Sequence, residues 1–199
     1  ETRYVTVNGA DVAYQVIGDG PFDLLYCYGL GSSIEATWEL RIGAEALRRL
    51  ASFSRLIFFD RRGNGASDAV SLGAMPTWED WTDDIVAVLD AAGSKQTAVM
   101  ASTDAGPIAV LFAAMHPEVV TALVLHDTSA RYLVANDYPI GASREGLDFF
   151  LELLAKWWGT PTFSRLTVPS MADDPDYIRL VSKAVSYTHL RAHETGRNL

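Results

Sequence analysis

The residues best suited to chemistry lie in a short turn, Ala101-Ser102-Thr103-Asp104-Ala105-Gly106, between a strand-like run and an alanine-rich helical run. A turn this sharp needs small flanking residues, and Ala101 and Ala105 meet that need. The central residue, Thr103, is then presented above the end of a strand, where its hydroxyl can attack a substrate carbonyl. The pattern predicts nucleophilic catalysis, with threonine where serine is usual.

A second loop has the composition to stabilise the intermediate of such a reaction. The stretch Tyr28-Gly29-Leu30-Gly31-Ser32 follows another apolar run, and its glycines let backbone N–H groups face a substrate carbonyl oxygen. Together with the N–H of Asp104, the N–H of Leu30 would form an oxyanion hole. A nucleotide-binding loop is the alternative, but the third glycine of a G-x-G-x-x-G motif is missing.

A base and an acid are harder to assign. His116 ends the helix after the turn, about 18 Å from Thr103 at 1.5 Å per residue, so it cannot be the base. Asp127 follows the next apolar run and is a candidate acid that would orient a histidine. The adjacent His126 cannot comfortably serve in the same triad, and a loop-capping role for this pair is the alternative. We therefore expect no complete triad within this chain.

The surrounding sequence predicts the elements that position these residues. Residues 4–17 indicate a β-hairpin, because Asn8-Gly9 suits a type I′ turn. Apolar runs then alternate with helical patterns: strands at 23–28, 55–59, 96–100 and 121–125, and helices at 44–51, 78–92 and 106–115. This alternation predicts an α/β fold with a mostly parallel sheet covered on both faces and the hairpin antiparallel at one edge. The loops after the parallel strands then meet at the edge where ligands bind.

The chain divides into three parts. Residues 1–127 are expected to form the sheet and its helices, and residues 128–184 a partial helical cap that begins with a Phe- and Leu-rich helix at 146–158. Residues 185–199 depart from this composition and carry His189 and His193. A frayed native helix, or a metal site formed by these histidines with Glu194, are the alternatives to a non-native tail; we expect no metal and no cofactor.

Several blocks in order resemble one branch of the α/β-hydrolases. The branch is the one whose hydrolase domain is often fused to a class III adenylate or guanylate cyclase domain in actinobacteria and related bacteria. The resemblance spans residues 2–143 and rests on six blocks: residues 14–21, 49–55, 59–63, 105–109, 111–118 and 137–139. In this alignment the block at 105–109 fits only if Thr103 is the central residue of the turn, although Asp104 and Ser102 are the neighbouring alternatives. The last residues, Val185 to Thr195, resemble the translation of a transposon-type adapter used in sequencing libraries.

The resemblance implies hydrolysis of an ester or similar acyl bond through a covalent intermediate, without a metal or organic cofactor. The expected partner is a small acyl or ester substrate or an apolar ligand, and the resemblance also allows a cyclase domain in the full-length parent. Tyr28 replaces the histidine that relatives carry in the oxyanion loop, and relatives draw their acid and base histidine from loops beyond the cap. We therefore expect a truncated chain that is inactive as given. A non-catalytic, ligand-sensing domain of a cyclase is the alternative.

Composition narrows the class of protein further. The 199 residues are 49% hydrophobic, enough for one domain with a sizeable core, and no run approaches the roughly 18 apolar residues of a membrane span. A formal net charge of −9 argues against binding to nucleic acids or anionic membranes, because their phosphates would be repelled. The N-terminus lacks a signal pattern, so a cytoplasmic location is expected. The single cysteine, Cys27, is expected to be buried and inert.

Overall fold

The main sheet confirms the predicted α/β fold. The computed structural model describes residues 1–29, 31, 33–158, 160–186 and 190–191. Six described strands form this sheet in the order β1-β2-β4-β3-β6-β7. Their bounds are β1 Arg3–Val7, β2 Ala10–Ile17, β3 Asp23–Cys27, β4 Arg55–Phe59, β6 Thr97–Ser102 and β7 Val120–His126. The β1–β2 hairpin is antiparallel and β2 pairs antiparallel with β4, whereas β4, β3, β6 and β7 run parallel.

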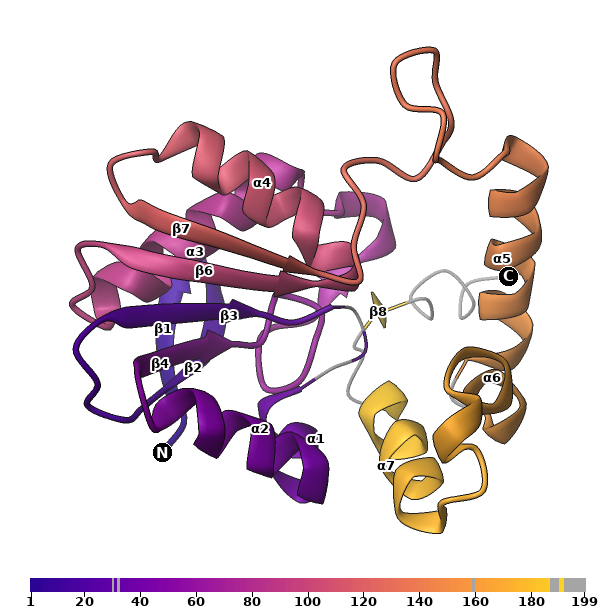
Figure 1. Ribbon diagram of the computed structural model, residues 1–199, viewed down its shortest axis with the longest axis horizontal. Helices are drawn as coiled ribbons and strands as arrows, with labels where there is room; N and C mark the ends of the chain where they lie inside the picture. Colours follow the sequence, from indigo (N-terminus) through magenta and orange to yellow (C-terminus); the bar gives the residue numbers. More distant parts are fainter. Residues whose placement is uncertain (30, 32, 159, 187–189, 192–199) are drawn as a thin grey trace.

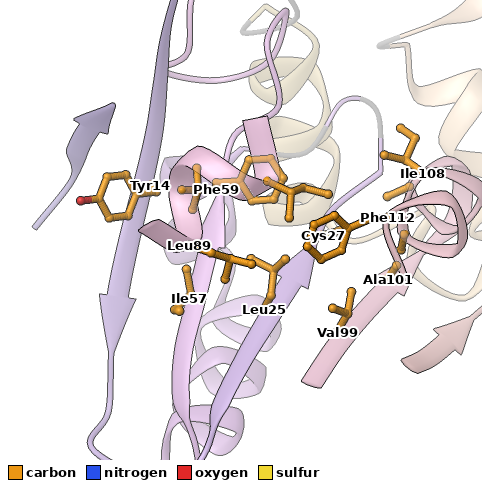
Figure 2. Packing of buried hydrophobic residues seen from close by; sticks show 14 of the residues in the cluster. Tyr14, Leu25, Cys27, Ile57, Phe59, Leu89, Val99, Ala101, Ile108 and Phe112 are labelled. Carbon is orange, nitrogen blue, oxygen red and sulfur yellow. The ribbon is translucent and has the colours of Figure 1, made fainter. Parts of the chain in front are cut away.

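Helices cover both faces of the sheet (Figure 1). They are α1 Ile34–Glu39, α2 Arg41–Ala51, α3 Trp78–Ala91 and α4 Gly106–Met115. Successive strand residues point to opposite faces, so Leu24 packs with the α1 and α2 side chains while Leu25 packs with those of α3 and α4. Figure 2 shows this second cluster, in which Ile57 and Val99 lie near Phe112 and Leu89. Both layers are apolar, which explains the continuous apolar strands in the sequence.

The turn after β4 ties three elements together through one buried carboxylate. Asp60 accepts the N–H of Ile34 at 2.8 Å and the N–H of Ala66 at 2.9 Å, so it joins β4 to the start of α1 and closes its own loop. A side chain at position 65 would place its Cβ 1.9 Å from an oxygen of Asp60, and Gly65 therefore admits the carboxylate. The Ser67 hydroxyl accepts the N–H of Ala13 at 2.8 Å, which anchors the same turn to β2.

Three further helices of the described residues lie beside the sheet, and we call them the cap helices. They are α5 Arg144–Trp157, α6 Pro161–Thr167 and α7 Pro175–Ser186, with the 3₁₀ turn η3 Pro169–Met171 between α6 and α7. Two other 3₁₀ turns, η1 Leu72–Ala74 and η2 Thr103–Ala105, follow β5 and β6. In Figure 1 the cap helices lie beyond the arrowheads of β6 and β7. Lys183 of α7 contacts Glu39 of α1, so the cap touches the layer beneath the sheet. No helix of the described residues combines the length and apolar character needed to cross a bilayer.

Part of the C-terminal tail has regular backbone structure. Residues 185 and 186 belong to α7, and β8 Leu190–Arg191 pairs in parallel with β5 Val70–Ser71. This pairing forms a two-stranded sheet separate from the main sheet. The pairing uses backbone groups, which any sequence can supply, so side-chain composition did not indicate it. The proposed adapter origin of residues 185–199 concerns the gene and stays a prediction.

Asp60 gives the fold a specific pH dependence. Burial raises the pKa of this carboxyl to about 6, and the hydrogen bonds from Ala66 and Ile34 offset only part of that rise. The folded chain therefore holds a proton that the unfolded chain releases near pH 4, and stability falls as pH rises from about 4 to 6. We expect the unfolding free energy of the wild type, relative to Asp60→Asn, to drop by up to about 3 kcal/mol across this window. Urea denaturation at several pH values measures the difference, and a constant difference would contradict the assignment.

Candidate active site

The turn after β6 holds Thr103 in a strained backbone conformation. Thr103 has φ +51°, whereas Ser102 before it is extended with φ −127° and Gly106 after it is helical with φ −59°. Among the described non-glycine residues, only Asn8, Thr103 and Asp127 have positive φ. For a β-branched residue this region is a genuine outlier that costs on the order of 1–3 kcal/mol. The strain therefore falls on the residue that the small-residue pattern places at the centre of the turn, and not on Ser102 or Asp104.

A hydroxyl from the neighbouring strand end holds this strained residue. Thr128, which follows β7, donates a hydrogen bond to the carbonyl oxygen of Thr103. The contact depends on Gly106, because a Cβ there would lie 2.0 Å from the Thr128 hydroxyl oxygen. The loop after β7 thereby fixes the loop after β6. Sequence reasoning missed Thr128, whose only signal was a hydroxyl residue directly after the candidate acid.

The hydroxyl of Thr103 lies against the first glycine of the oxyanion loop. A Cβ added to Gly29 would lie 1.9 Å from Thr103 Oγ1 and 2.7 Å from Asp104 Oδ1. Only glycine allows the two loops this close an approach. Leu30, the predicted oxyanion donor in this loop, lies outside the described residues, and Gly31 beyond it has φ +82°. The role of the Leu30 and Asp104 N–H groups stays a prediction.

A carboxylate contacts the Thr103 hydroxyl. Thr103 Oγ1 donates to Asp104 Oδ1 at 3.2 Å, and the second oxygen of Asp104 lies 2.7 Å from a nitrogen of Arg61. Arg61 is only 10% exposed, and its guanidinium lies over the Trp81 ring at 4.5 Å from the ring centre. Cation–π contact and ion pairing together fix the guanidinium. Sequence reasoning did not identify Arg61 or Trp81 because their pairing is set by tertiary structure.

Tyr28, the first residue of the predicted oxyanion loop, packs against the core. Its ring centre lies 4.3 Å from that of Tyr26 and 6.2 Å from that of Phe58. Burial raises the pKa of the Tyr28 hydroxyl far above its usual value. The hydroxyl therefore stays protonated at neutral pH and cannot act as a base there.

The two histidines of the described part of the chain differ in position. His116 ends α4, where its ring lies 4.9 Å from that of Phe112, and it lines a cavity with α3 residues that does not include Thr103. His126 ends β7 opposite Ser102 in the strand register. The next residue, Asp127, has φ +51° and lies on the wall of the cavity that contains Thr103. Its assignment as the acid stays a prediction.

A large cavity separates this turn from the cap. Its volume is about 790 Å³, within the range of roughly 300–1,000 Å³ that is typical of ligand sites. Thr103, Asp104 and Asp127 lie on the sheet side, and α5 and α6 supply the opposite side. Within the described residues no group of three His, Cys, Asp or Glu side chains is arranged to hold a metal ion. Thr103 therefore lies on the wall of a cavity large enough to hold a small molecule.

Comparison with known proteins identifies the family to which the chain belongs. The alpha/beta hydrolase fold family matches residues 24–170, and the chain belongs to this family. The enol-lactonase from Burkholderia xenovorans LB400 has a similar structure, with TM-score 0.68 at 22% identity over 94% of this chain and 68% of the lactonase. An epoxide hydrolase from Vigna radiata has TM-score 0.53 at 27% identity, over 63% of this chain and 37% of the hydrolase.

A third solved structure extends the comparison. Est816, described as an N-acyl homoserine lactone degrading enzyme, has TM-score 0.60 at 19% identity over 92% of this chain and 69% of its own. A search of curated proteins found no match. The chain spans 68%, 37% and 69% of the three structures, so each of them contains a substantial part with no counterpart here.

The close approach of the two loops gives a direct test of this geometry. We expect Gly29→Ala to lower the unfolding free energy by about 1–3 kcal/mol, because the new methyl group overlaps the Thr103 hydroxyl and forces both loops to shift. Gly73→Ala is the matched control, since a Cβ there meets only the Ser71 hydroxyl at an ordinary 3.8 Å. Chemical denaturation measures both variants. A Gly29→Ala variant as stable as the wild type would show that the loops are further apart.

Proposed function

We propose that this chain is part of a hydrolase that cleaves an ester or similar acyl bond, with Thr103 as the nucleophile. The observation that supports this proposal is the positive φ of Thr103 at the wall of a 790 Å³ cavity. That backbone conformation is costly for threonine and serves to expose a side chain above the sheet edge. The related enol-lactonase and the N-acyl homoserine lactone degrading enzyme are named for cyclic esters, which fits an acyl substrate.

In the proposed reaction the Thr103 oxygen attacks the substrate carbonyl and forms a covalent acyl intermediate, which water then hydrolyses. The N–H groups of Leu30 and Asp104 would stabilise the negative charge on the carbonyl oxygen. The proton of Thr103 needs an acceptor. Asp104 receives the hydrogen bond at 3.2 Å but is already paired with Arg61, so its carboxylate orients the hydroxyl without being an effective base. We assign the base to a histidine of the longer parent protein, with Asp127 as the acid that orients it.

A ligand-sensing domain is the second candidate. It is favoured by the contact between the Thr103 hydroxyl and a carboxylate, and by the position of Tyr28 in the core. In this candidate the cavity binds an apolar or acyl ligand without turnover and regulates an attached adenylate or guanylate cyclase domain. A histidine after the last strand of the parent would favour the enzyme, and its absence would favour the sensor.

We also propose the division of the chain that the sequence indicates: residues 1–127 as the hydrolase core, 128–184 as part of the cap, and 185–199 as a non-native tail. The uninterrupted gene tests this division and the cyclase fusion together. A parent whose sequence continues unchanged through residues 185–199 would contradict the adapter origin. If the full-length parent has no cyclase domain, the second candidate function, regulation of an attached cyclase, is wrong.

We expect the 199-residue chain to hydrolyse short p-nitrophenyl esters no faster than a blank. A nucleophile without its base loses several orders of magnitude in rate. Release of p-nitrophenol, followed by absorbance, checks this expectation, with Thr103→Ala as the control. Turnover well above the blank that disappears in Thr103→Ala would show that the chain already contains a working base.

In the full-length parent we expect Thr103→Ser to raise esterase activity. Serine offers the same hydroxyl to the same N–H donors without the methyl group that restricts χ1 of threonine. The measurement compares ester hydrolysis and cyclase output for both proteins. Hydrolysis at the level of the blank in both, with cyclase output that still responds to ligand, would instead support the sensor. Wild-type hydrolysis that the serine variant fails to match would show that threonine is the selected nucleophile.

A further inference from the structure

The cavity above Thr103 has two chemically different walls. Every described lining side chain from α5, from Trp158 that follows it and from α6 is apolar: Leu147, Phe150, Leu151, Leu154, Trp158 and Phe163. The wall from the sheet edge instead carries hydroxyl and carboxyl groups, including those of Thr103, Asp127 and Tyr132. A ligand that satisfies both walls has a polar head group at the sheet edge and an apolar tail against the cap.

The side chains of the apolar wall are partly exposed to solvent. Leu147, Phe150, Leu151 and Leu154 follow the i, i+3, i+4, i+7 spacing of one helical face, so α5 presents them together. Phe150 is nevertheless 43% exposed and Leu151 is 50% exposed. An apolar tail on this face would remove that surface from water, which is the main source of affinity for such a ligand.

The polar wall is negatively charged. The described residues that line the cavity include Asp104 and Asp127 but no lysine, arginine or histidine. Arg61 compensates Asp104 from behind at 2.7 Å, and none of the described lining residues does the same for Asp127. A head group with its own negative charge would therefore be repelled beside Thr103.

Trp158 limits the cavity at the end of α5. Its indole lies against the oxyanion loop, since a Cβ on Gly31 would be 2.6 Å from the indole ring. The ring also packs edge-on against Phe163, with 5.1 Å between the ring centres. These two contacts restrain the indole, which can therefore limit how far an apolar tail extends from Thr103.

We propose that the cavity selects amphiphiles with an uncharged head group, that Asp127 excludes anionic head groups, and that Trp158 sets the length of the apolar tail. The inference rests on the proposed function, because it places the acyl carbonyl of a neutral ester or lactone at Thr103. It specifies the substrate class as neutral esters or lactones with an alkyl tail. Products with a free carboxylate would then leave readily, since the wall that accepts the ester repels the acid.

Binding of three ligands with the same tail tests the charge rule on the 199-residue chain. Octanol, octanoate and octylammonium are titrated at pH 7 against the neutral fluorophore Nile red, and its displacement is followed. We expect octanoate to bind at least about tenfold more weakly than octanol, and Asp127→Asn to remove most of that charge-dependent difference. Asp148→Asn is the matched control, because Asp148 is an exposed acid of α5 outside the cavity lining. Octanoate that binds as well as octanol, or a difference unchanged in Asp127→Asn, would overturn the rule.

A series of 1-alkanols from hexanol to dodecanol tests the role of Trp158. Affinity should rise about fourfold per methylene while the tail stays on the apolar wall, and should level off when it reaches the indole. Trp158→Ala should move the levelling point to longer alcohols, and Trp158→Phe should move it less. Trp157→Ala is the control, since that ring lies beside Lys156 and does not line the cavity. The same levelling point in Trp158→Ala and in the wild type would overturn the assignment.

These binding measurements are independent of turnover. Thr103→Ala should keep the head-group and tail preferences while it abolishes any hydrolysis by the full-length parent. Preferences that persist where wild-type hydrolysis is absent would refute the enzyme and leave the ligand class intact. Hydrolysis by the parent without these preferences would refute the ligand class and leave the enzyme intact.

Discussion

The strained backbone of Thr103 is the constraint on which the arrangement of the site depends. A threonine with φ +51° is not stable on local grounds, so other segments must hold it there. Thr128 does so through the Thr103 carbonyl oxygen, and Gly106 leaves room for that contact. Gly29 brings the oxyanion loop against the same side chain. The loops after β3, β6 and β7 therefore form one structural unit. A shift of any of these loops is expected to move the Thr103 hydroxyl.

A second chain of contacts sets the charge around that hydroxyl. Asp60 fixes the turn after β4, and the residue that follows it, Arg61, pairs with Asp104 while it lies over Trp81. The buried carboxylate of Asp60 thus determines where the cation that compensates Asp104 is placed. Because Arg61 pairs with Asp104, the acid next to the Thr103 hydroxyl has its charge balanced. Asp127 has no such cation among the described residues that line the cavity, so the cavity wall has a net negative charge. The turn after β4 therefore contributes both to the fold, through Asp60, and to the charge of the cavity wall, through Arg61.

The sequence predicted the features that depend on local pattern. The apolar runs, the Asn8-Gly9 turn and the small residues around Thr103 each act within a few positions, and the hairpin, the parallel sheet and the strained turn all appear in the structure. It did not predict Thr128, Arg61 or Trp158, because they contact Thr103, Asp104 and Gly31, which lie 25 or more positions away and are brought close by packing. The pairing of Leu190 with Val70, in a separate two-stranded sheet, was not predicted because pairing between backbone groups leaves no side-chain signature.

The geometry of the described residues is compatible with both proposed functions, catalysis and ligand sensing. The two differ in that catalysis needs a base that activates Thr103. Strain at Thr103, the open apolar wall and the charge of Asp127 all act on a bound molecule before any bond changes. None of them requires a proton acceptor, and the carboxylate that receives the Thr103 hydrogen bond is already engaged by Arg61. Selection of the ligand and chemistry on the ligand are therefore separable in this fold. In the proposed function, the ligand preference rests on described residues, whereas turnover needs a base within reach of Thr103 Oγ1.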